Sequence, residues 1–250
     1  MAGHSKFKNI QHRKGAQDKK RGKIFTKLVK EIIVAAKSGQ PDPDFNPRLR
    51  SALIAARAGN LPKDRIENAL KQATNPAGGD NYDEMRYEGY APGGIAIIVE
   101  ALTDNRNRTA SVVRAAFSKA GGNMGETGSV SFMFDKLGII EFDASKCSAD
   151  DMFEAAIEAG ADNVESDKDI HIIYTSVENY SSALDFLTEK FGDPLESKIA
   201  WKAHNNIVVT EKERAEKLLK MIDAIEESDD VQEVFGAYEF SDEVMEELNN

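Results

Sequence analysis

The order of the apolar segments between residues 138 and 202 restricts the fold more than any other feature of the chain. Short β-branched runs and longer helical patterns follow one another there as strand, helix, strand, strand, helix and strand. This order is typical of a ferredoxin-like unit. The expected strands are 138–142, 163–166, 170–175 and 196–201, and the expected helices are 149–159 and 178–191.

The segments on either side of this unit predict a second set of strands and helices. Each side has the order strand, helix, strand, and the two sides together would form another unit of the same type. We therefore expect the first unit to be inserted into the second, since the ends of a compact domain often lie close together. One larger mixed sheet is the competing arrangement. The expected elements are 95–101, 107–120 and 129–134 before the insertion, and 207–209, 211–226 and 231–237 after it.

The first 75 residues carry helical patterns instead. A helix is expected over 17–37, ended by Ser38-Gly39-Gln40-Pro41, and two more over 47–58 and 62–74. Residues 74–80 have the composition of a linker. One apolar stripe of the first helix is expected to be buried, and it consists of Ile24, Phe25, Leu28, Val29, Ile32 and Ile33.

These patterns predict an α+β fold, with a helical N-terminal domain followed by two ferredoxin-like α/β domains, one inserted into the other. The length of 250 residues is sufficient for up to three domains. The expected boundaries are 1–78 for the basic helical domain, 79–135 with 204–250 for the discontinuous α/β domain II, and 136–203 for the inserted α/β domain III.

The charge of the chain is unevenly distributed. The net charge is −11, but residues 1–80 hold 17 basic and 7 acidic residues, while residues 81–250 hold 15 basic and 36 acidic residues. Residues 1–40 alone hold 11 basic and 2 acidic residues. Such asymmetry indicates one region that meets polyanions and another that repels them.

The basic region is the expected nucleic-acid contact. Lys20, Lys23, Lys27 and Lys30 lie opposite the apolar stripe of helix 17–37, at 100° per residue. We call these four residues the lysine ladder. Basic side chains neutralise phosphates, and an aromatic ring can stack on an exposed base. The expected contacts are Lys6, Phe7, Lys8, His12, Arg13, Lys14, Lys19, Lys20, Arg21, Lys23, Lys27, Lys30, Arg106 and Arg108.

Two alternatives stay open for this set. The N-terminal segment could be a solvated basic tail, and, as a separate alternative, Phe7 could pack on the helical bundle. Arg106 and Arg108 begin a helix that Thr103, Asp104 or Asn105 could cap, where main-chain amides also favour anions. The alternative there is a capping turn whose arginines are solvated or salt-bridged.

Several classes of protein are not expected. No apolar run approaches the length of a membrane span, and the N-terminus lacks the apolar region of a secretory signal. The single cysteine, Cys147, favours a reducing, cytoplasmic compartment and is expected to be inert. No metal, phosphate-loop or catalytic-triad motif occurs, so we expect no cofactor and no enzymatic activity. The acidic residues at 241–250 are expected to form a solvated tail.

The sequence also resembles a known family. Met1-Ala2-Gly3-His4-Ser5-Lys6, Asn46-Pro47-Arg48-Leu49-Arg50 and Leu102-Thr103-Asp104-Asn105-Arg106-Asn107-Arg108-Thr109 are similar to signatures of the YebC/PmpR family. The resemblance covers nearly the whole chain, although Phe7 and Ala91 stand where the family usually has Trp and Gly. The family comprises bacterial proteins named as transcriptional regulators and the mitochondrial translational activator of cytochrome c oxidase subunit one. The resemblance implies three domains, with no known enzymatic activity.

Two functions therefore remain from the sequence. The first is a DNA-binding transcriptional regulator, and the second is a ribosome-associated translation factor that contacts ribosomal RNA. Both use the basic region, so charge does not separate them. The acidic domains could face cationic surfaces of the ribosome or of the transcription machinery. An enzyme would require a cleft assembled from residues distant in sequence.

Overall fold

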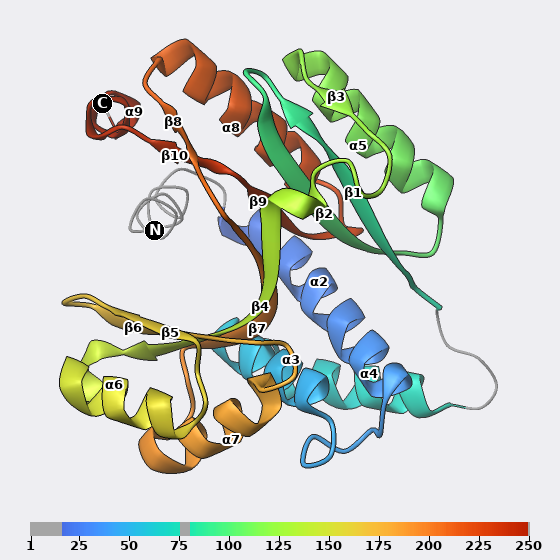
Figure 1. Ribbon diagram of the computed structural model, residues 1–250. Coiled ribbons are helices and arrows are strands. Elements are labelled where there is room, and N and C mark those ends of the chain that lie inside the picture. Colours follow the sequence, from blue (N-terminus) through green and yellow to red (C-terminus); the bar gives the residue numbers. More distant parts are fainter. Residues whose placement is uncertain (1–16, 76–80, 250) are drawn as a thin grey trace. The chain divides into compact units, whose positions relative to one another are not determined.

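The computed structural model of the chain describes residues 17–75 and 81–249, and the side chains of residues 22–75 and 81–248 (Figure 1). It confirms the α+β class, with a helical region followed by sheets covered by helices. Two compact units are present. Of the described residues, the first unit holds those up to Lys27, 81–135 and 202–249, and the second unit holds 28–75 and 136–201.

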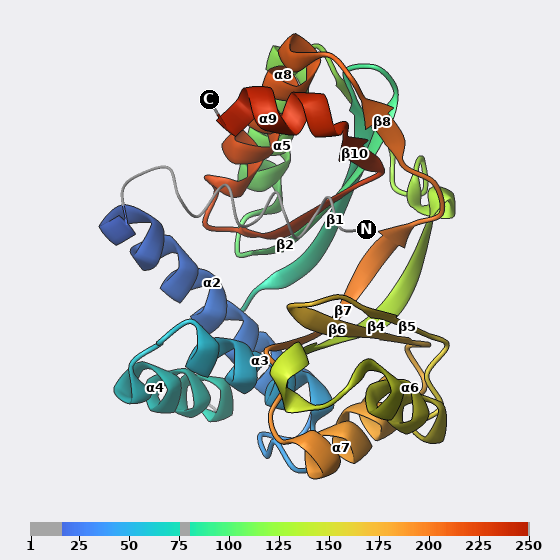
Figure 2. The same ribbon diagram turned by 90° about the vertical axis from the view of Figure 1, so that its left-hand side faces the viewer.

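The second unit contains a four-stranded sheet in the order β5-β6-β4-β7. Helices α6 and α7 cover one face of this sheet and bury a core that includes Phe142, Ile173 and Leu184 (Figure 2). Numbered within the inserted segment, the strand order is 2-3-1-4, which is the ferredoxin-like order expected from the sequence. The elements are β4 Phe134–Asp143, α6 Ala149–Glu158, β5 Asn163–Ser166, β6 Ile170–Thr175, α7 Tyr180–Phe191 and β7 Glu196–Ala203.

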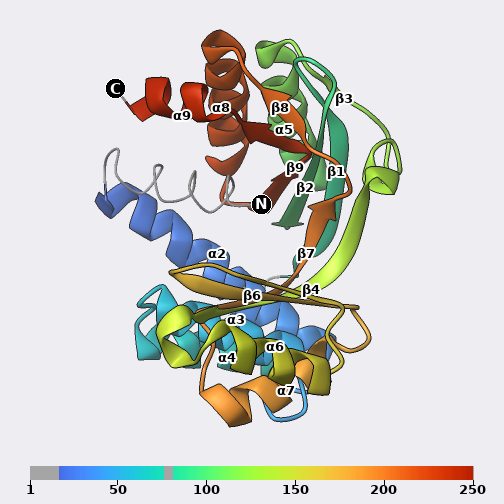
Figure 3. The ribbon, with the colours of Figure 1, turned by 60° about the vertical axis from the view of Figure 1, so that its left-hand side comes forward.

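The N-terminal helices after Leu28 belong to this same unit. Helix α2 spans Gln17–Ser38, α3 spans Pro47–Ala58 and α4 spans Lys63–Thr74. Buried Asn46 accepts a hydrogen bond from the amide of Leu49 and so caps α3. The Ser51 hydroxyl lies 2.7 Å from the Tyr180 hydroxyl, which joins α3 to α7. Figure 3 shows the ribbons of α3 and α4 beside that of α2.

The first unit is formed by chain segments before and after the insertion. Its larger sheet has the order β3-β1-β2-β9, and the buried strand β2 pairs antiparallel with β9. Helices α5 and α8 lie side by side (Figure 2), and their buried side chains belong to one shared core. The elements are β1 Asp83–Ala91, β2 Ile95–Thr103, α5 Arg106–Ala120, β3 Asn123–Met124, β8 Ile207–Val209, α8 Lys212–Glu226, β9 Val231–Gly236, β10 Tyr238–Phe240 and α9 Asp242–Asn249.

Several details of the first unit differ from the expectation, among them the short strands β3 and β10, which were not predicted. The expected strand 129–134 is wrong, because Ser131–Met133 form a 3-10 helix and β4 begins only at Phe134. Strand β1 was not predicted at all. The acidic segment 241–250 was expected to be solvated, but α9 occupies most of it and buries Val244 against the core. The division of the chain into three domains stays a prediction.

Candidate nucleic-acid interface

Most of the expected phosphate contacts in the N-terminal segment lie outside the described residues. Lys19, Lys20 and Arg21 belong to α2, but their side chains are also outside the described part. The remaining members of this group are Lys6, Phe7, Lys8, His12, Arg13 and Lys14. Their role stays a prediction from charge and composition.

Two members of the lysine ladder contact the end of helix α8 within the first unit. The Lys23 Nζ lies 2.8 Å from the main-chain oxygen of Glu227 and 3.1 Å from its Oε1. The Lys27 Nζ donates to the main-chain oxygen of Glu226 at 3.3 Å. These oxygens belong to the last carbonyls of a helix, which carry partial negative charge and attract cations. Burial lowers the pKa of Lys27, although Glu226, Asp229 and Glu233 oppose that shift.

The expectation of an exposed ladder is wrong at Lys30. This side chain is 7% exposed. The cause is the packing of the second half of α2, where five consecutive residues, Ile32, Ile33, Val34, Ala35 and Ala36, are all buried. A helix that is buried all round leaves no polar face for a lysine to occupy. Helical periodicity fixed the angular position of Lys30 but not whether that side faces solvent.

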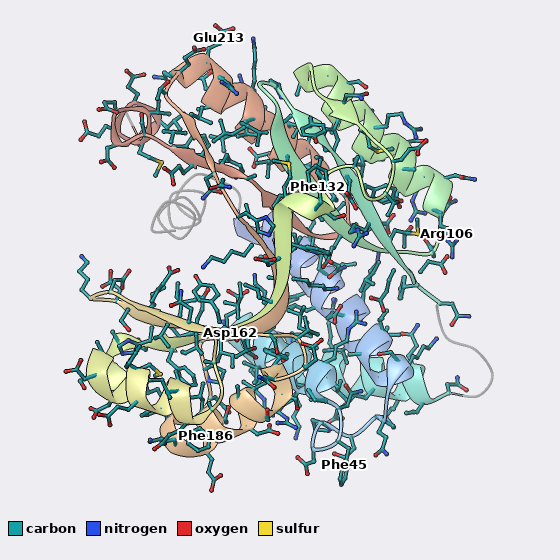
Figure 4. The ribbon with its side chains drawn as sticks, in the orientation of Figure 1. Phe45, Arg106, Phe132, Asp162, Phe186 and Glu213 are labelled. Carbon is teal, nitrogen blue, oxygen red and sulfur yellow. The ribbon has the colours of Figure 1, made fainter. Side chains whose placement is uncertain are left out.

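Arg106 and Arg108 are salt-bridged at the start of α5, as in the alternative raised from the sequence. Asn105 caps the helix by accepting from the amide of Arg108. The Arg106 Nε lies 2.8 Å from an Asp83 carboxylate oxygen, and Figure 4 shows Arg106 beside the start of α5. The hydrogen bond and charge of Asp83 raise the pKa of Arg106, and Arg106 in turn lowers the pKa of Asp83.

Arg108 joins a network built around a buried carboxylate. Its Nη2 lies 2.7 Å from Asp230 Oδ2 and 2.6 Å from Asp104 Oδ1. Asp230, which is 5% exposed, also accepts hydrogen bonds from the hydroxyls of Thr109 at 2.8 Å and Thr103 at 3.3 Å. The hydrogen bonds that Arg108 donates to Asp230 and Asp104 raise its pKa. This guanidinium is therefore engaged internally on two carboxylates.

A second buried carboxylate holds the loop that precedes β4. One oxygen of Glu88 accepts from the amides of Val130 and Ser131, both at 2.9 Å, and the other lies 2.9 Å from Arg86 Nε. Burial would raise the pKa of Glu88, but these amides, that of Gly128 and the Arg86 charge together lower it. These bonds explain why the expected strand 129–134 does not form. The same loop carries Phe132, which is 70% exposed (Figure 4).

Neither buried carboxylate was singled out from the sequence. Glu88 lies on the strand that the sequence analysis missed. Asp230 ends the acidic run Glu226-Glu227-Ser228-Asp229-Asp230, to which no separate role was assigned from the sequence. An acidic residue directly before an apolar strand was the only available signal for Asp230. Nothing in the local pattern indicated that Arg108, Thr103 and Thr109 would converge on it.

Other candidate chemistry is sparse over the described residues. In that part of the chain no group of three or more His, Cys, Asp or Glu side chains is arranged to hold a metal ion. The Cys147 thiol is free, and burial raises its pKa, which makes it a weaker nucleophile. His171 is buried, and its ring contacts the Ser166 hydroxyl and the Cys147 carbonyl. No helix among the described residues combines the length and apolar character that a membrane span requires.

Comparison with known proteins assigns the chain to a family. The model of the TACO1/YebC N-terminal domain matches residues 5–76, and that of the TACO1/YebC second and third domain matches residues 82–238. A relative from Rickettsia bellii is 61% identical over 248 residues, covering 99% of this chain and 97% of its own. One from Rickettsia felis is 60% identical over 247 residues, covering 98% of each chain. Both are named "Probable transcriptional regulatory protein".

A solved structure agrees with this assignment. The crystal structure of a conserved hypothetical protein from Aquifex aeolicus matches with a TM-score of 0.81 at 43% identity, over 90% of this chain and 93% of that one. Family models that match residues 5–76 and 82–238, relatives that are similar over nearly their whole length and a matching fold lead to one conclusion: the chain belongs to the TACO1/YebC family.

Proposed function

We propose that this protein is a non-enzymatic, nucleic-acid-binding regulator of gene expression that acts in the cytoplasm as a DNA-binding transcriptional regulator. The observation that carries the proposal is the separation of charge along the chain. Residues 1–22 hold seven basic residues and one acidic residue, whereas residues 81–250 have a net charge of −21. Phosphate backbones attract the first region and repel the second. The names of the relatives agree with a regulatory role.

The basic residues before Lys23 are the strongest candidates for the contact. Lys23 and Lys27 are bonded to the end of α8, and Lys30 is buried. Arg106 and Arg108 are held by carboxylates. The candidates before Lys23, whose side chains lie outside the described residues, are Lys6, Lys8, Arg13, Lys14, Lys19, Lys20 and Arg21.

A second candidate is a ribosome-associated translation factor that contacts RNA. The strongly acidic character of residues 81–250 favours this candidate, because those residues would resist lying along a nucleic-acid duplex. They could instead face cationic surfaces of ribosomal proteins. Crosslinking in cells, followed by sequencing of the bound nucleic acid, separates the two candidates. Recovery of promoter DNA would support the transcriptional regulator, and recovery of ribosomal or messenger RNA would support the translation factor.

Charge reversal tests the shared claim. We expect the variant Lys14→Glu, Lys19→Glu, Lys20→Glu, Arg21→Glu to bind a short DNA duplex or RNA strand at least about tenfold more weakly than the unaltered protein. The log–log salt slope should fall by about 3 to 4 units, close to one per lost phosphate contact. Fluorescence anisotropy over a salt series measures both quantities.

The matched control makes the same change of charge elsewhere. Lys71, Arg114, Lys119 and Lys168 are exposed elsewhere in the chain, and their replacement by Glu also reverses three lysines and one arginine. This control should retain much more of the affinity than the N-terminal variant. Equal losses in both variants would mean that overall charge, rather than the N-terminal segment, governs binding.

A further inference from the structure

The turn that follows helix α8 is unusually acidic and directly contacts the basic helix. Its sequence is Glu226-Glu227-Ser228-Asp229-Asp230, in which four of five residues are acidic. It begins at the last carbonyls of α8, where the helix dipole adds partial negative charge. The turn therefore combines carboxylates and main-chain oxygens in one anionic surface, which we call the acidic turn.

Lys23 and Lys27, which lie one helical turn apart on α2, both contact the acidic turn. Lys23 contacts both the main-chain oxygen and the carboxylate of Glu227, and Lys27 contacts the main-chain oxygen of Glu226. A phosphate group would offer these lysines the same chemistry, namely anionic oxygens that accept hydrogen bonds. Both lysines and the acidic turn belong to the first unit, so the contact lies within one compact body.

The contact between the two lysines and the acidic turn is weak enough for another anion to displace it. The Glu227 side chain is 77% exposed and the Lys23 side chain is 27% exposed, and ion pairs this close to solvent are weak and screened by salt. Burial lowers the pKa of Lys27 despite its acidic neighbours, so holding this charge against α8 has a desolvation cost. Both lysines can therefore be transferred to a stronger anionic partner.

We propose that the acidic turn is an autoinhibitory contact, which occupies Lys23 and Lys27 and must release them before these lysines bind nucleic acid. This inference rests on the proposed function, because it concerns the same basic surface. Displacement of the acidic turn makes two lysines along α2 available to phosphate groups. The acidic turn thereby lowers affinity for weakly charged or short nucleic acids.

Neutralising the acidic turn tests the proposal. The variant Glu226→Gln, Glu227→Gln, Asp229→Asn removes three of the four carboxylates of the acidic turn, keeps Glu233 of β9, and leaves the buried Asp230 network intact. We expect it to bind a short DNA duplex and a single-stranded RNA about three- to tenfold more tightly, with a salt slope steeper by up to about 2 units. Fluorescence anisotropy measures both quantities, and circular dichroism confirms folding.

A control with the same change of net charge isolates position from charge. Glu126→Gln, Glu239→Gln, Glu247→Gln also removes three exposed carboxylates, but none of them contacts the acidic turn in the described structure. This control should change affinity less than twofold. The single variant Glu227→Gln provides a milder test if the triple variant does not fold.

Lysine reactivity provides a readout that needs no nucleic acid. Acetylation by a small reagent, followed by mass spectrometry, should modify Lys23 and Lys27 several-fold faster in the triple variant than in the unaltered protein or the control. Unchanged reactivity together with unchanged affinity would overturn the autoinhibitory contact and leave the proposed function standing. If neither protein binds either probe at low salt, the proposed function fails, and the inference fails with it.

Discussion

The two pairs of basic residues in the first unit differ in what holds them. Arg108 is bonded to Asp230, which is 5% exposed and also accepts from two threonine hydroxyls. Lys23 is bonded to Glu227, whose side chain is 77% exposed. Both side chains were expected to contact phosphate, and both are ion-paired. The difference is that one anionic partner is part of the core, while the other lies at the surface.

This difference separates structural cations from available ones. A carboxylate that is buried and left without its cation carries a large desolvation cost, so Arg108 cannot leave Asp230 without destabilising the fold. An exposed carboxylate returns to water at little cost, so Lys23 can leave Glu227. The burial of the partner, rather than the presence of a salt bridge, therefore decides whether a basic residue remains available to a ligand.

The largest expected effect is at Asp230. Replacement by Ala leaves Arg108, Thr103 and Thr109 without their shared acceptor, and we expect a loss of about 3 kcal/mol in the free energy of unfolding of the first unit. Hydrogen exchange of the β2 amides measures this loss, because β2 is the central buried strand of that unit. A loss below about 1 kcal/mol would show that the network is not structural and would remove the basis of the comparison.

A smaller effect is expected at Glu88, where the buried carboxylate is held mainly by amides. Replacement by Gln should cost about 1–2 kcal/mol at neutral pH, since the amides of Val130 and Ser131 lose a charged acceptor. Because the pKa of Glu88 is lowered by folding, its contribution is present above the ordinary glutamate pKa, about 4.3, and is lost as the pH falls through the folded value.

The pH dependence is the sharper measurement for Glu88. The difference in stability between the unaltered protein and Glu88→Gln should be constant near neutral pH and shrink below about pH 4. Hydrogen exchange of the amides of Val130 and Ser131, compared between the two proteins, reports the loop itself. A difference that instead grows with acidity would mean that the carboxylate is not ionised in the folded state.

Replacement of Lys27 by Met is expected to change stability little. The methionine removes a partly buried charge but keeps an unbranched apolar chain against α8, so the free energy of unfolding should change by less than about 1 kcal/mol. Burial lowers the pKa of Lys27, which means that the protein gains little from its charge. A loss similar to that of the Asp230 variant would make Lys27 a structural cation and would argue against its release to nucleic acid.

The smallest effect on stability is expected for Glu227→Gln. The exposed pair with Lys23 contributes little, so the change should be below about 0.5 kcal/mol. The same variant should raise the affinity for nucleic acid and leave the stability almost unchanged. The Asp230 variant should instead lose stability. Thermal unfolding of the variant beside the unaltered protein measures the stability change. A large destabilisation would erase the distinction between the two ion pairs.

Much of the fold could be predicted from the local sequence. Helices 47–58 and 149–158 and strands 163–166 and 170–175 lie at or within one residue of the expected bounds, because caps and turn residues mark their ends. The order of elements also gave the sheet of the inserted segment. Strand β1 was missed because its alternation is interrupted by charges and by Gly89, whose Cβ would collide with the backbone of β3.

The candidate site was less predictable than the fold. The charge asymmetry and the angular position of the lysines follow from residue types and helical geometry alone. The side chains of the basic residues up to Arg21 lie outside the described residues, so their contacts stay a prediction. The capping role of Asn105 was among the expected alternatives, because asparagine before a helix is a local signal.

The sequence by itself determined the α+β class, the order of elements and the separation of a basic end from an acidic remainder, since each depends on neighbours in the chain. Only the tertiary structure decided which cations are engaged. Arg108 meets Asp230 across 122 residues and Lys23 meets Glu227 across 204 residues. The strength of such contacts depends on burial, and burial is set by elements that pack together from distant parts of the chain.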